Sequence, residues 1–553
     1  MRNSKVVIVG GGLAGMSTAK ELAKRDIRST ILECSTRMGG KAGAELNKEA
    51  KAAGFSDHGY HIFPKWYVNV RQVLKDIGVL DTLIDFDRVH YLRTDEFPQL
   101  CTLYEPSIRN IWRNIRSRLS YAYVALLGMY SVLDLSSRKF NNEKAVLDRQ
   151  SFNGFIRSRF YATKRLAEIH QGFVLQASAI PSYRISAMTA ANVVGAYLKS
   201  PSPLQSILPT DLSSGFITPF KKHLVEAGVE IQSNTKVTRI QVDDFLVTEI
   251  EIVDTVNPNA GSKRLKLNPD DFIVLATPCE VTRQFVTNFV ISAEETASPK
   301  DLNGSECRLA DLQALESVPM AGFDIYFNRK LASIPREHVV CYRSRYELSF
   351  LDISQNWECF KKRPDQPTVL SVIASNFVPL KTLNSDDAMK QLLRELAKYL
   401  KFGEEDIDFK QSQMHQNLNS PLFLNTVGSW TFRPKSTTRI KNLFLAGDYC
   451  QTTADLTTME GAIQSGMNAA NQILDRLGGE RVIVQTIPRY PRWQPRLAVW
   501  VAMPIVFLVF LYGWIREKIE DDMDETKPTD PRKVEWMWRH PVAAKSKSKA
   551  AGA

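Results

Sequence analysis

The stretch that decides the fold is KVVIVGGGLAG, residues 5–15. An apolar run precedes the glycines and a helical pattern follows them, which predicts a strand, a turn and a helix. Gly10 permits a tight turn, Gly12 lets backbone amides approach a pyrophosphate, and Gly15 allows close packing of the helix. The order therefore predicts a phosphate-binding turn at the N-terminus of a helix.

A second apolar run, residues 29–32, predicts a neighbouring strand that ends in Glu33, downstream of the glycine motif. A carboxylate at this position can accept the hydroxyls of an adenosine ribose. A lone glycine motif is weak support, because glycine turns are common. Strand, glycines, helix, strand and acid in this order predict a dinucleotide site.

Composition narrows the class of protein. A chain of 553 residues implies two or three parts, and 44% hydrophobic with 24% charged residues is typical of folded proteins. The seven cysteines are scattered without CxxC spacing, which favours a reducing compartment. A net charge of +11 fits nucleic acid or an anionic membrane. Because no recognised nucleic-acid module accompanies it, we expect no nucleic-acid partner.

Five further segments carry a family resemblance: residues 37–41 (RMGGK), 54–63 (GFSDHGYHIF), 228–237, 271–278 (DFIVLATP) and 442–462. With the first motif they resemble the flavin amine oxidase superfamily. The similarity is closest to plant- and cyanobacterial-type phytoene and zeta-carotene desaturases, with hydroxysqualene dehydroxylases as relatives.

The resemblance implies FAD as cofactor and an α/β fold. In this fold a discontinuous Rossmann-like FAD-binding domain accompanies a mixed-sheet substrate domain and a helical, membrane-facing insertion. Asp448 can accept ribitol hydroxyls, and free amides at a helix start can face the pyrimidine end of the flavin. The cofactor-binding residues we expect are Gly10, Gly12, Leu13, Ala14, Gly15, Glu33, Arg37, Gly39, Gly40, Lys41, Gly59, Tyr60, His61, Val237, Gly447, Asp448, Met459, Glu460 and Ala462.

The resemblance also implies the chemistry. A carotenoid-type desaturase removes two hydrogens from a long hydrophobic isoprenoid, with hydride transfer to flavin N5. Tyr60 and His61 are the catalytic candidates, and the alternative for His61 is a packing role. Hydroxysqualene-type dehydroxylation, polyene isomerisation, amine oxidation and lipid carriage remain open. The loop from Tyr449 to Thr458 has no Trp, which counts against the aromatic cage of an amine oxidase. Ser35 and Lys41 stand where relatives have Arg.

The predicted organisation is discontinuous. The FAD-binding parts are 1–90, 206–285 and 426–480, with a helical insertion at 91–205 and a substrate domain at 286–425. Residues 481–553 form a basic linker, a membrane anchor at 497–515 and a charged tail that we expect to be disordered.

The anchor carries no charged residue and is long enough to cross a bilayer nearly completely. Pro504 would bend a helix, so spanning and monotopic insertion both remain open. Basic residues precede the run, and if it spans they place the main body on the cytoplasmic side. The start of the chain shows no secretory pattern, so we expect no export. The electron acceptor we expect is a membrane quinone or dioxygen.

The first insertion carries Arg109, Arg113, Arg116 and Arg118 beside apolar residues, followed by the apolar stretch 121–133. This pattern predicts an interfacial helix on an anionic membrane, with a core helix pair as the alternative. The histidines His338 and His415 stand isolated in the sequence, so we predict no metal site.

Overall fold

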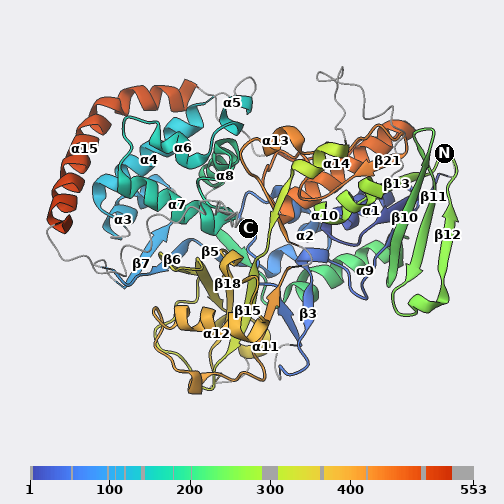
Figure 1. Ribbon diagram of the computed structural model, residues 1–553, viewed down its shortest axis with the longest axis horizontal. Coiled ribbons are helices and arrows are strands. Elements are labelled where there is room, and N and C mark those ends of the chain that lie inside the picture. Colours follow the sequence, from blue (N-terminus) through green and yellow to red (C-terminus); the bar gives the residue numbers. More distant parts are fainter. Residues whose placement is uncertain are drawn as a thin grey trace, which may run out of the picture.

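The protein is described as a computed structural model, and Figure 1 shows its lobes. The residues described are 4–50, 54–95, 99–105, 107–117, 120–138, 144–178, 180–200, 202–288, 309–361, 366–418, 421–486 and 493–525. The charged tail expected to be disordered lies outside these residues.

The parallel-sheet lobe contains a five-stranded sheet in the order β21-β13-β1-β2-β9, and each neighbouring pair is parallel. A Cβ on Gly466 would lie 2.2 Å from the carbonyl oxygen of Ala14, so glycine brings α14 tightly against α1. The elements are β1 (Val6–Val9), α1 (Leu13–Ala23), β2 (Ser29–Leu32), α2 (Val68–Asp76), α9 (Thr218–Glu226), β9 (Glu230–Gln232), β10 (Thr235–Asp243), β11 (Leu246–Asp254), β12 (Ser262–Lys266), β13 (Phe272–Leu275), α10 (Cys279–Asn288), β21 (Leu443–Leu445) and α14 (Met459–Leu477).

The mixed-sheet lobe is a seven-stranded sheet in the order β19-β15-β18-β17-β16-β6-β7. Only β16 and β6 pair in parallel; the other neighbours are antiparallel. Its elements are β6 (Arg88–Leu92), β7 (Leu100–Tyr104), β15 (Ala321–Tyr326), β16 (Val339–Cys341), β17 (Leu348–Asp352), α11 (Glu358–Lys361), β18 (Val369–Ala374), α12 (Ser385–Leu396) and β19 (Gln413–Gln416).

The boundary expected at residue 90 differs from the structure, because β6 crosses it and β7 follows. The two strands complete the mixed sheet, since β6 pairs with β16 from a distant part of the chain and β7 pairs with β6. Three further sheets are antiparallel pairs of strands: β3 (Ala44–Leu46) with β4 (Phe55–Asp57), β5 (Ile84–Phe86) with β8 (Gln205–Ile207), and β14 (Glu316–Val318) with β20 (Leu422–Leu424). The short helix α13 (Ser429–Phe432) follows β20.

The helical lobe is built from residues 111–199 and a last helix that curves along its outside (Figure 1). Its helices are α3 (Ile111–Arg116), α4 (Ala122–Ser137), α5 (Lys144–Asp148), α6 (Phe152–Arg157), α7 (Lys164–Ser178), α8 (Ala187–Lys199) and α15 (Trp493–Glu525). Among the described residues, α15 is the helix long and apolar enough to cross a membrane, with a mean hydropathy of 2.2.

The apolar stretch of α4, predicted as an interfacial helix, instead packs beneath α15. Tyr123, Val124, Leu127 and Tyr130 are buried, in one cluster with Val506 of α15. A Cβ on Gly513 would lie 2.5 Å from the Tyr123 ring, so the two helices approach closely. The helix-pair alternative therefore holds for α4.

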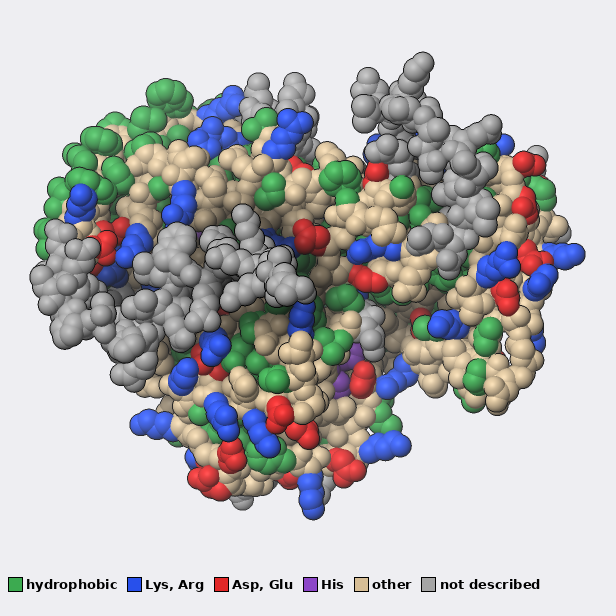
Figure 2. Space-filling model, in the orientation of Figure 1, with side chains coloured by type: hydrophobic (Ala, Val, Ile, Leu, Met, Phe, Trp, Pro, Cys, Tyr) green, Lys and Arg blue, Asp and Glu red, His purple; other side chains and the backbone are tan. Residues whose placement is uncertain are grey.

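The opposite side of α15 is bare. An outer stripe of seven residues recurs every three or four positions and each is 51–69% exposed: Leu497, Val501, Ile505, Leu508, Tyr512, Ile515 and Ile519. Figure 2 shows hydrophobic side chains gathered along this edge of the lobe. A helix on a water-facing surface normally turns polar residues outward, so the outer stripe needs a partner.

Candidate functional site

The turn between β1 and α1 is built by contacts that only glycine permits. Gly10 has a φ of +108°, and a Cβ there would lie 2.5 Å from the carbonyl oxygen of Ala276. A Cβ on Gly15 would lie 2.1 Å from the carbonyl oxygen of Gly10. At Gly12 the Cβ position is 3.9 Å from the nearest atoms. The turn is tight at both ends and open at Gly12, where a pyrophosphate is expected.

A second glycine turn packs against the first. The Gly39 N–H donates to the carbonyl oxygen of Gly11 at 2.8 Å, and both Gly39 and Gly40 have positive φ, at +110° and +58°. A Cβ on Gly40 would lie 3.2 Å from the Gly12 Cα. The predicted segment 37–41 therefore forms one wall of the open position. Leu13 and Ala14 are buried at the start of α1, so only their backbone can serve a ligand there.

Glu33 lies at the end of β2 beside the first turn. One carboxylate oxygen accepts the Gly11 N–H at 2.7 Å and the other accepts the Ser35 N–H at 2.8 Å. The Thr235 N–H donates to the Glu33 carbonyl, which brings the start of β10 to this end of the site. Val237 follows on β10 with its side chain buried in the core. Two backbone N–H groups thus hold the Glu33 carboxylate beside the first turn, and its contact with an adenosine ribose stays a prediction.

Lys41 and Asp448 meet at the far side of the glycine turns. Their Nζ and Oδ2 atoms are 3.7 Å apart. The Lys41 Nζ is buried and has no hydrogen-bond partner among the described residues. The Gly447 N–H donates to Ser465 Oγ of α14 at 2.8 Å, which fixes the backbone before Asp448. An ammonium with an unused donor and a carboxylate with acceptor capacity both suit a phosphorylated polyol.

The start of α14 supplies backbone donors. Thr458 caps the helix, because its Oγ1 accepts the Gly461 N–H at 3.1 Å and its carbonyl accepts the Ala462 N–H at 3.0 Å. The amides of Met459 and Glu460 have no acceptor within the helix. They are the donors available to a ligand that approaches this helix end, where the dipole is positive.

The Glu460 side chain has another task. Its carboxylate accepts the Asn69 and Val70 backbone N–H groups, and the Asn69 side-chain amide at 2.6 Å, at the start of α2. Burial raises the pKa of Glu460 to about 7, against these hydrogen bonds. Because the Glu460 carboxylate is engaged with α2, only its backbone N–H remains for the predicted contact with the cofactor. Arg37 is similarly engaged, donating to the carbonyl of Ala44 at 2.7 Å.

The segment with Gly59, Tyr60 and His61 lies against the mixed sheet. Gly59 has a φ of +118°, and a Cβ there would lie 2.7 Å from the Ile373 side chain. The Tyr60 hydroxyl contacts His338 Nε2 and, at 2.6 Å, Ser349 Oγ, so Tyr60 is tied to the mixed sheet. His61 Nδ1 is buried without a hydrogen-bond partner among the described residues. Burial lowers the pKa of His61 to about 4, so its ring is neutral at pH 7.

Sequence reasoning missed a buried ion pair behind this site. Arg433 is wholly buried and pairs with Asp455, which is also buried. The Arg433 guanidinium also donates to the carbonyls of Tyr449 and Cys450. The pair therefore braces the loop from Tyr449 to Thr458, and no local sequence pattern links its two members.

His338 and His415, which stand isolated along the sequence, have hydrogen-bond partners in the fold. His338 contacts Tyr60 and Gln205, and His415 contacts Ser56 and Glu45. All four partners come from segments far away along the chain. Spacing along the sequence carries no signal for such contacts.

The arrangement fits FAD. We call the site formed by residues 10–15, Glu33, residues 39–41 and Asp448 the cradle. Its turn leaves open space at Gly12, and Lys41 presents an ammonium that is paired with Asp448 but makes no hydrogen bond to the described residues. Glu33 presents a carboxylate beside Gly11, and Asp448 presents one beside Lys41. A dinucleotide with a ribose at one end, phosphates at the centre and a ribitol beyond them requires this order of groups.

Known proteins resemble this chain in sequence and in fold. The chain is 23% identical over 495 residues to 15-cis-phytoene desaturase, chloroplastic/chromoplastic, from Oncidium hybrid cultivar, covering 85% of this chain and 78% of that one. It is 22% identical over 502 residues to the zeta-carotene desaturase, chloroplastic/chromoplastic, of Arabidopsis thaliana, covering 85% of both chains. Cyclohexylamine oxidase from Brevibacterium oxydans IH-35A shares the fold, with a TM-score of 0.56 and 15% identity over 86% of this chain and 100% of that one.

Residues 13–474 match the family described as flavin containing amine oxidoreductase. This confirms the family and the FAD cofactor expected from the motifs. The chain therefore belongs to the flavin containing amine oxidoreductase family and is an FAD-dependent oxidoreductase.

Proposed function

We propose that the protein desaturates a long hydrophobic isoprenoid at a membrane surface. The observation that carries the substrate class is the match to phytoene and zeta-carotene desaturases, which runs over 85% of this chain and most of theirs. Such a match covers the cofactor segments and also both insertions, so it extends to the parts that meet substrate. The absence of Trp from the loop 449–458 supports a substrate other than an amine.

FAD supplies the hydride acceptor when bound. The chain must hold the substrate carbon against it, exclude water and provide for the proton lost from the neighbouring carbon. The His61 ring, with an unused Nδ1, can stabilise positive charge as it develops on the substrate. Because burial lowers the pKa of His61 to about 4, the ring is a weak acceptor for the departing proton at pH 7. Tyr60 acts as a positioning residue, because its hydroxyl is committed to His338 and Ser349 and holds the 59–61 segment to the mixed sheet.

The outer stripe of α15 supports membrane association. Seven apolar side chains line one face of a helix whose opposite face is already packed on α4. Burying such a stripe in the interfacial region of a bilayer removes it from water without disturbing the packed face. The proposed membrane contact therefore involves α15 rather than α4.

Contacts at both ends of α15 support a helix lying flat, without spanning. Near its start, the Tyr130 hydroxyl donates to the carbonyl of Val499 at 3.3 Å; near its end, the Tyr123 hydroxyl donates to Glu517 at 3.0 Å. Arg165 of α7 pairs with Glu520 at 2.6 Å. A spanning helix would have to give up all of these contacts. A monotopic protein, with its body on the cytoplasmic side, would draw isoprenoid and a quinone acceptor from the same leaflet; dioxygen is the alternative acceptor.

The test is anaerobic bleaching of the flavin in detergent-purified protein, with products identified by mass. Phytoene, zeta-carotene, hydroxysqualene and a set of polyamines would be offered in turn. We expect bleaching by a polyene precursor together with the loss of two hydrogens from it. Bleaching by polyamines alone would overturn the proposal in favour of amine oxidation.

A matched control separates substrate binding from flavin loss. Reduction by dithionite should bleach the flavin fully in every sample, which shows that the cofactor is competent. If all substrates then fail, the desaturase proposal fails, and turnover of pre-reduced enzyme with hydroxysqualene or a cis-polyene would identify dehydroxylation or isomerisation instead.

A further inference from the structure

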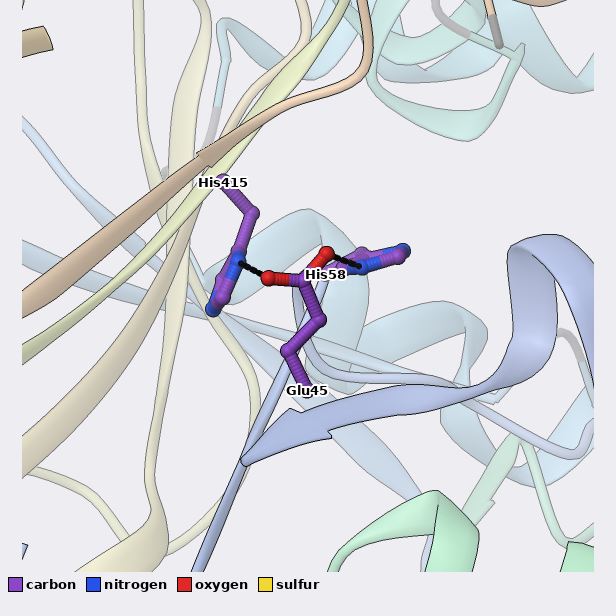
Figure 3. Close-up of side chains that lie close together, drawn as sticks. All are labelled: Glu45, His58 and His415. Carbon is purple, nitrogen blue, oxygen red and sulfur yellow. Dashed lines mark hydrogen bonds and ion pairs between the residues drawn. The ribbon is translucent and has the colours of Figure 1, made fainter. Parts of the chain in front are cut away.

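Two histidines and a glutamate meet where the parallel-sheet and mixed-sheet lobes join. Figure 3 shows the Glu45 carboxylate between the rings of His58 and His415, with one oxygen directed at each. The distances are 3.1 Å from Glu45 Oε1 to His58 Nε2 and 3.3 Å from Glu45 Oε2 to His415 Nδ1. All three potential ligand atoms lie within 4.8 Å of one another.

The three residues come from separate segments. Glu45 is on β3, His58 directly follows β4, and His415 is on β19 of the mixed sheet. The His415 side chain is 6% exposed, whereas those of His58 and Glu45 are 30% and 50% exposed. The cluster is thus anchored from below by a buried ring and open to solvent on the other side, which leaves an entry path for an ion.

A hydrogen-bond chain fixes which His415 nitrogen is available. The single hydroxyl proton of Ser56 is donated to Asp324 Oδ2 at 2.7 Å. Ser56 Oγ therefore accepts the Nε2–H of His415 at 2.8 Å. In the neutral ring this leaves a lone pair on Nδ1, the atom that faces the Glu45 oxygen. Two acceptors therefore face each other at 3.3 Å, an arrangement that a cation between them would stabilise.

We propose that Glu45, His58 and His415 bind a divalent transition-metal ion of the zinc class. Two imidazoles and one carboxylate form a ligand set suited to Zn²⁺, and three protein ligands leave a fourth position for water. Tetrahedral ligands ~2.0–2.1 Å from Zn²⁺ are about 3.3–3.4 Å apart. The 3.3 Å contact from Glu45 Oε2 to His415 Nδ1 already has that spacing. His58 Nε2 contacts the other oxygen, Oε1, at 3.1 Å and would shift slightly to share the ion. Asp324, reached through Ser56, completes the supporting carboxylate that metal-bound histidines commonly have.

The ion would clamp the flavin-facing segment to the mixed sheet. His58 immediately precedes Gly59, Tyr60 and His61, and its carbonyl already packs against Gly322, where a Cβ would lie 2.2 Å from the His58 oxygen. A metal bound to His58 and His415 would therefore join β19 to the segment that precedes His61. The site acts as a positioning device, separate from the hydride acceptor.

The experiment is zinc binding by tag-free, FAD-loaded protein that has been treated with EDTA and desalted. Titration of Zn²⁺ against a chromophoric chelator should give one tight equivalent. Co²⁺ should give the visible absorption of a four-coordinate N,O site, which reports the ligand set directly. Glu45→Gln should weaken zinc affinity by ~10–100-fold, and His415→Ala should abolish the tight equivalent.

Controls distinguish lost ligands from lost folding. Glu45 is half exposed, so Glu45→Gln should keep its flavin spectrum and thermal midpoint in the absence of metal. His223→Ala on α9, a histidine outside the cluster, should bind zinc as the wild type does. Ser56→Ala should weaken binding while leaving all three ligands in place. Absence of a tight equivalent, or an equivalent that survives in Glu45→Gln and His415→Ala, would overturn the proposal; the first outcome would mean that a proton occupies the space between Glu45 and His415.

Discussion

The FAD cradle and the outer stripe of α15 are specified in opposite ways. The cradle depends on side chains that are missing: Gly10, Gly12 and Gly15 allow backbones to approach a ligand or each other. The stripe depends on side chains that are present at every third or fourth position of one long helix. At Gly10 and Gly15 the first arrangement has no room for an added atom, whereas the second tolerates any apolar residue. A single substitution at a cradle glycine should therefore have a large effect that depends on the position. Along the stripe, each substitution should lower membrane affinity by a similar increment.

The largest effect is expected at the cradle. Gly12→Val should abolish FAD retention while leaving the apo fold intact, because its Cβ position is open and only the cofactor would be displaced. Gly15→Val should destabilise the fold as well, since the Cβ would meet the Gly10 carbonyl. Flavin absorbance per protein, with circular dichroism of the apo form, measures both effects. Gly195→Val on α8, where space is free, is the control; equal flavin in Gly12→Val and Gly195→Val would refute the assignment.

The next effect is expected at the stripe. Replacing Val501, Ile505 and Leu508 with Glu should weaken binding to anionic vesicles about 1,000-fold, because each residue contributes ~1.5 kcal/mol of apolar burial. Flavin content should not change. Vesicle co-sedimentation measures the binding. Deleting α15 would be a poorer test, since it uncovers α4.

The control for the stripe uses exposed apolar residues elsewhere. Glu at Val225, Val256 and Ile483 adds the same charge to other surfaces. Vesicle binding should then fall only through the repulsion between the three added carboxylates and the anionic lipids. If the two triple variants lose binding equally, the membrane contact does not run through α15.

The strand, the glycine turn and the helix at residues 6–23 could be predicted from the sequence because their signals are local. Gly10, Gly15 and Glu33 lie close together in one short segment, and each glycine has a steric reason that spacing reveals. The apolar run 497–515 was recognisable in the sequence, but the packing of α15 on α4 was not. A run of apolar residues does not indicate which other segment it packs against. Arg433 with Asp455, and Glu45 with His58 and His415, escaped prediction for the same reason. Tertiary contacts between distant segments make those sites.

A smaller effect tests the brace behind the cradle. Arg433→Met should lower the free energy of unfolding by about 3 kcal/mol, because the cation beside the buried Asp455 is lost. The double variant Arg433→Met with Asp455→Asn should recover part of this. Urea unfolding measures both. A double variant as unstable as Arg433→Met would show that packing of the Arg433 side chain, rather than its charge, is what the loop requires.

The smallest effect concerns pH. Burial, together with His90, lowers the folded-state pKa of His338 to about 4, below the unfolded value near 6.5. The neutral ring therefore contributes stability above pH 6.5 that is lost as the pH falls towards 4. The stability deficit of His338→Gln should shrink by about 1 kcal/mol between pH 7.5 and 5.5. Thermal unfolding measures it, with His223→Gln as control; a deficit that is constant with pH would contradict the neutral His338 that holds Tyr60.

The pairing of α4 with α15 sets an order of events during synthesis. All of the chain from residue 138 to residue 492 separates the end of α4 from the start of α15. At about 5–20 residues per second, the ribosome needs roughly 20–70 seconds to supply the cover for the apolar face of α4. During that interval the apolar face of α4 lacks the partner that buries it in the folded protein.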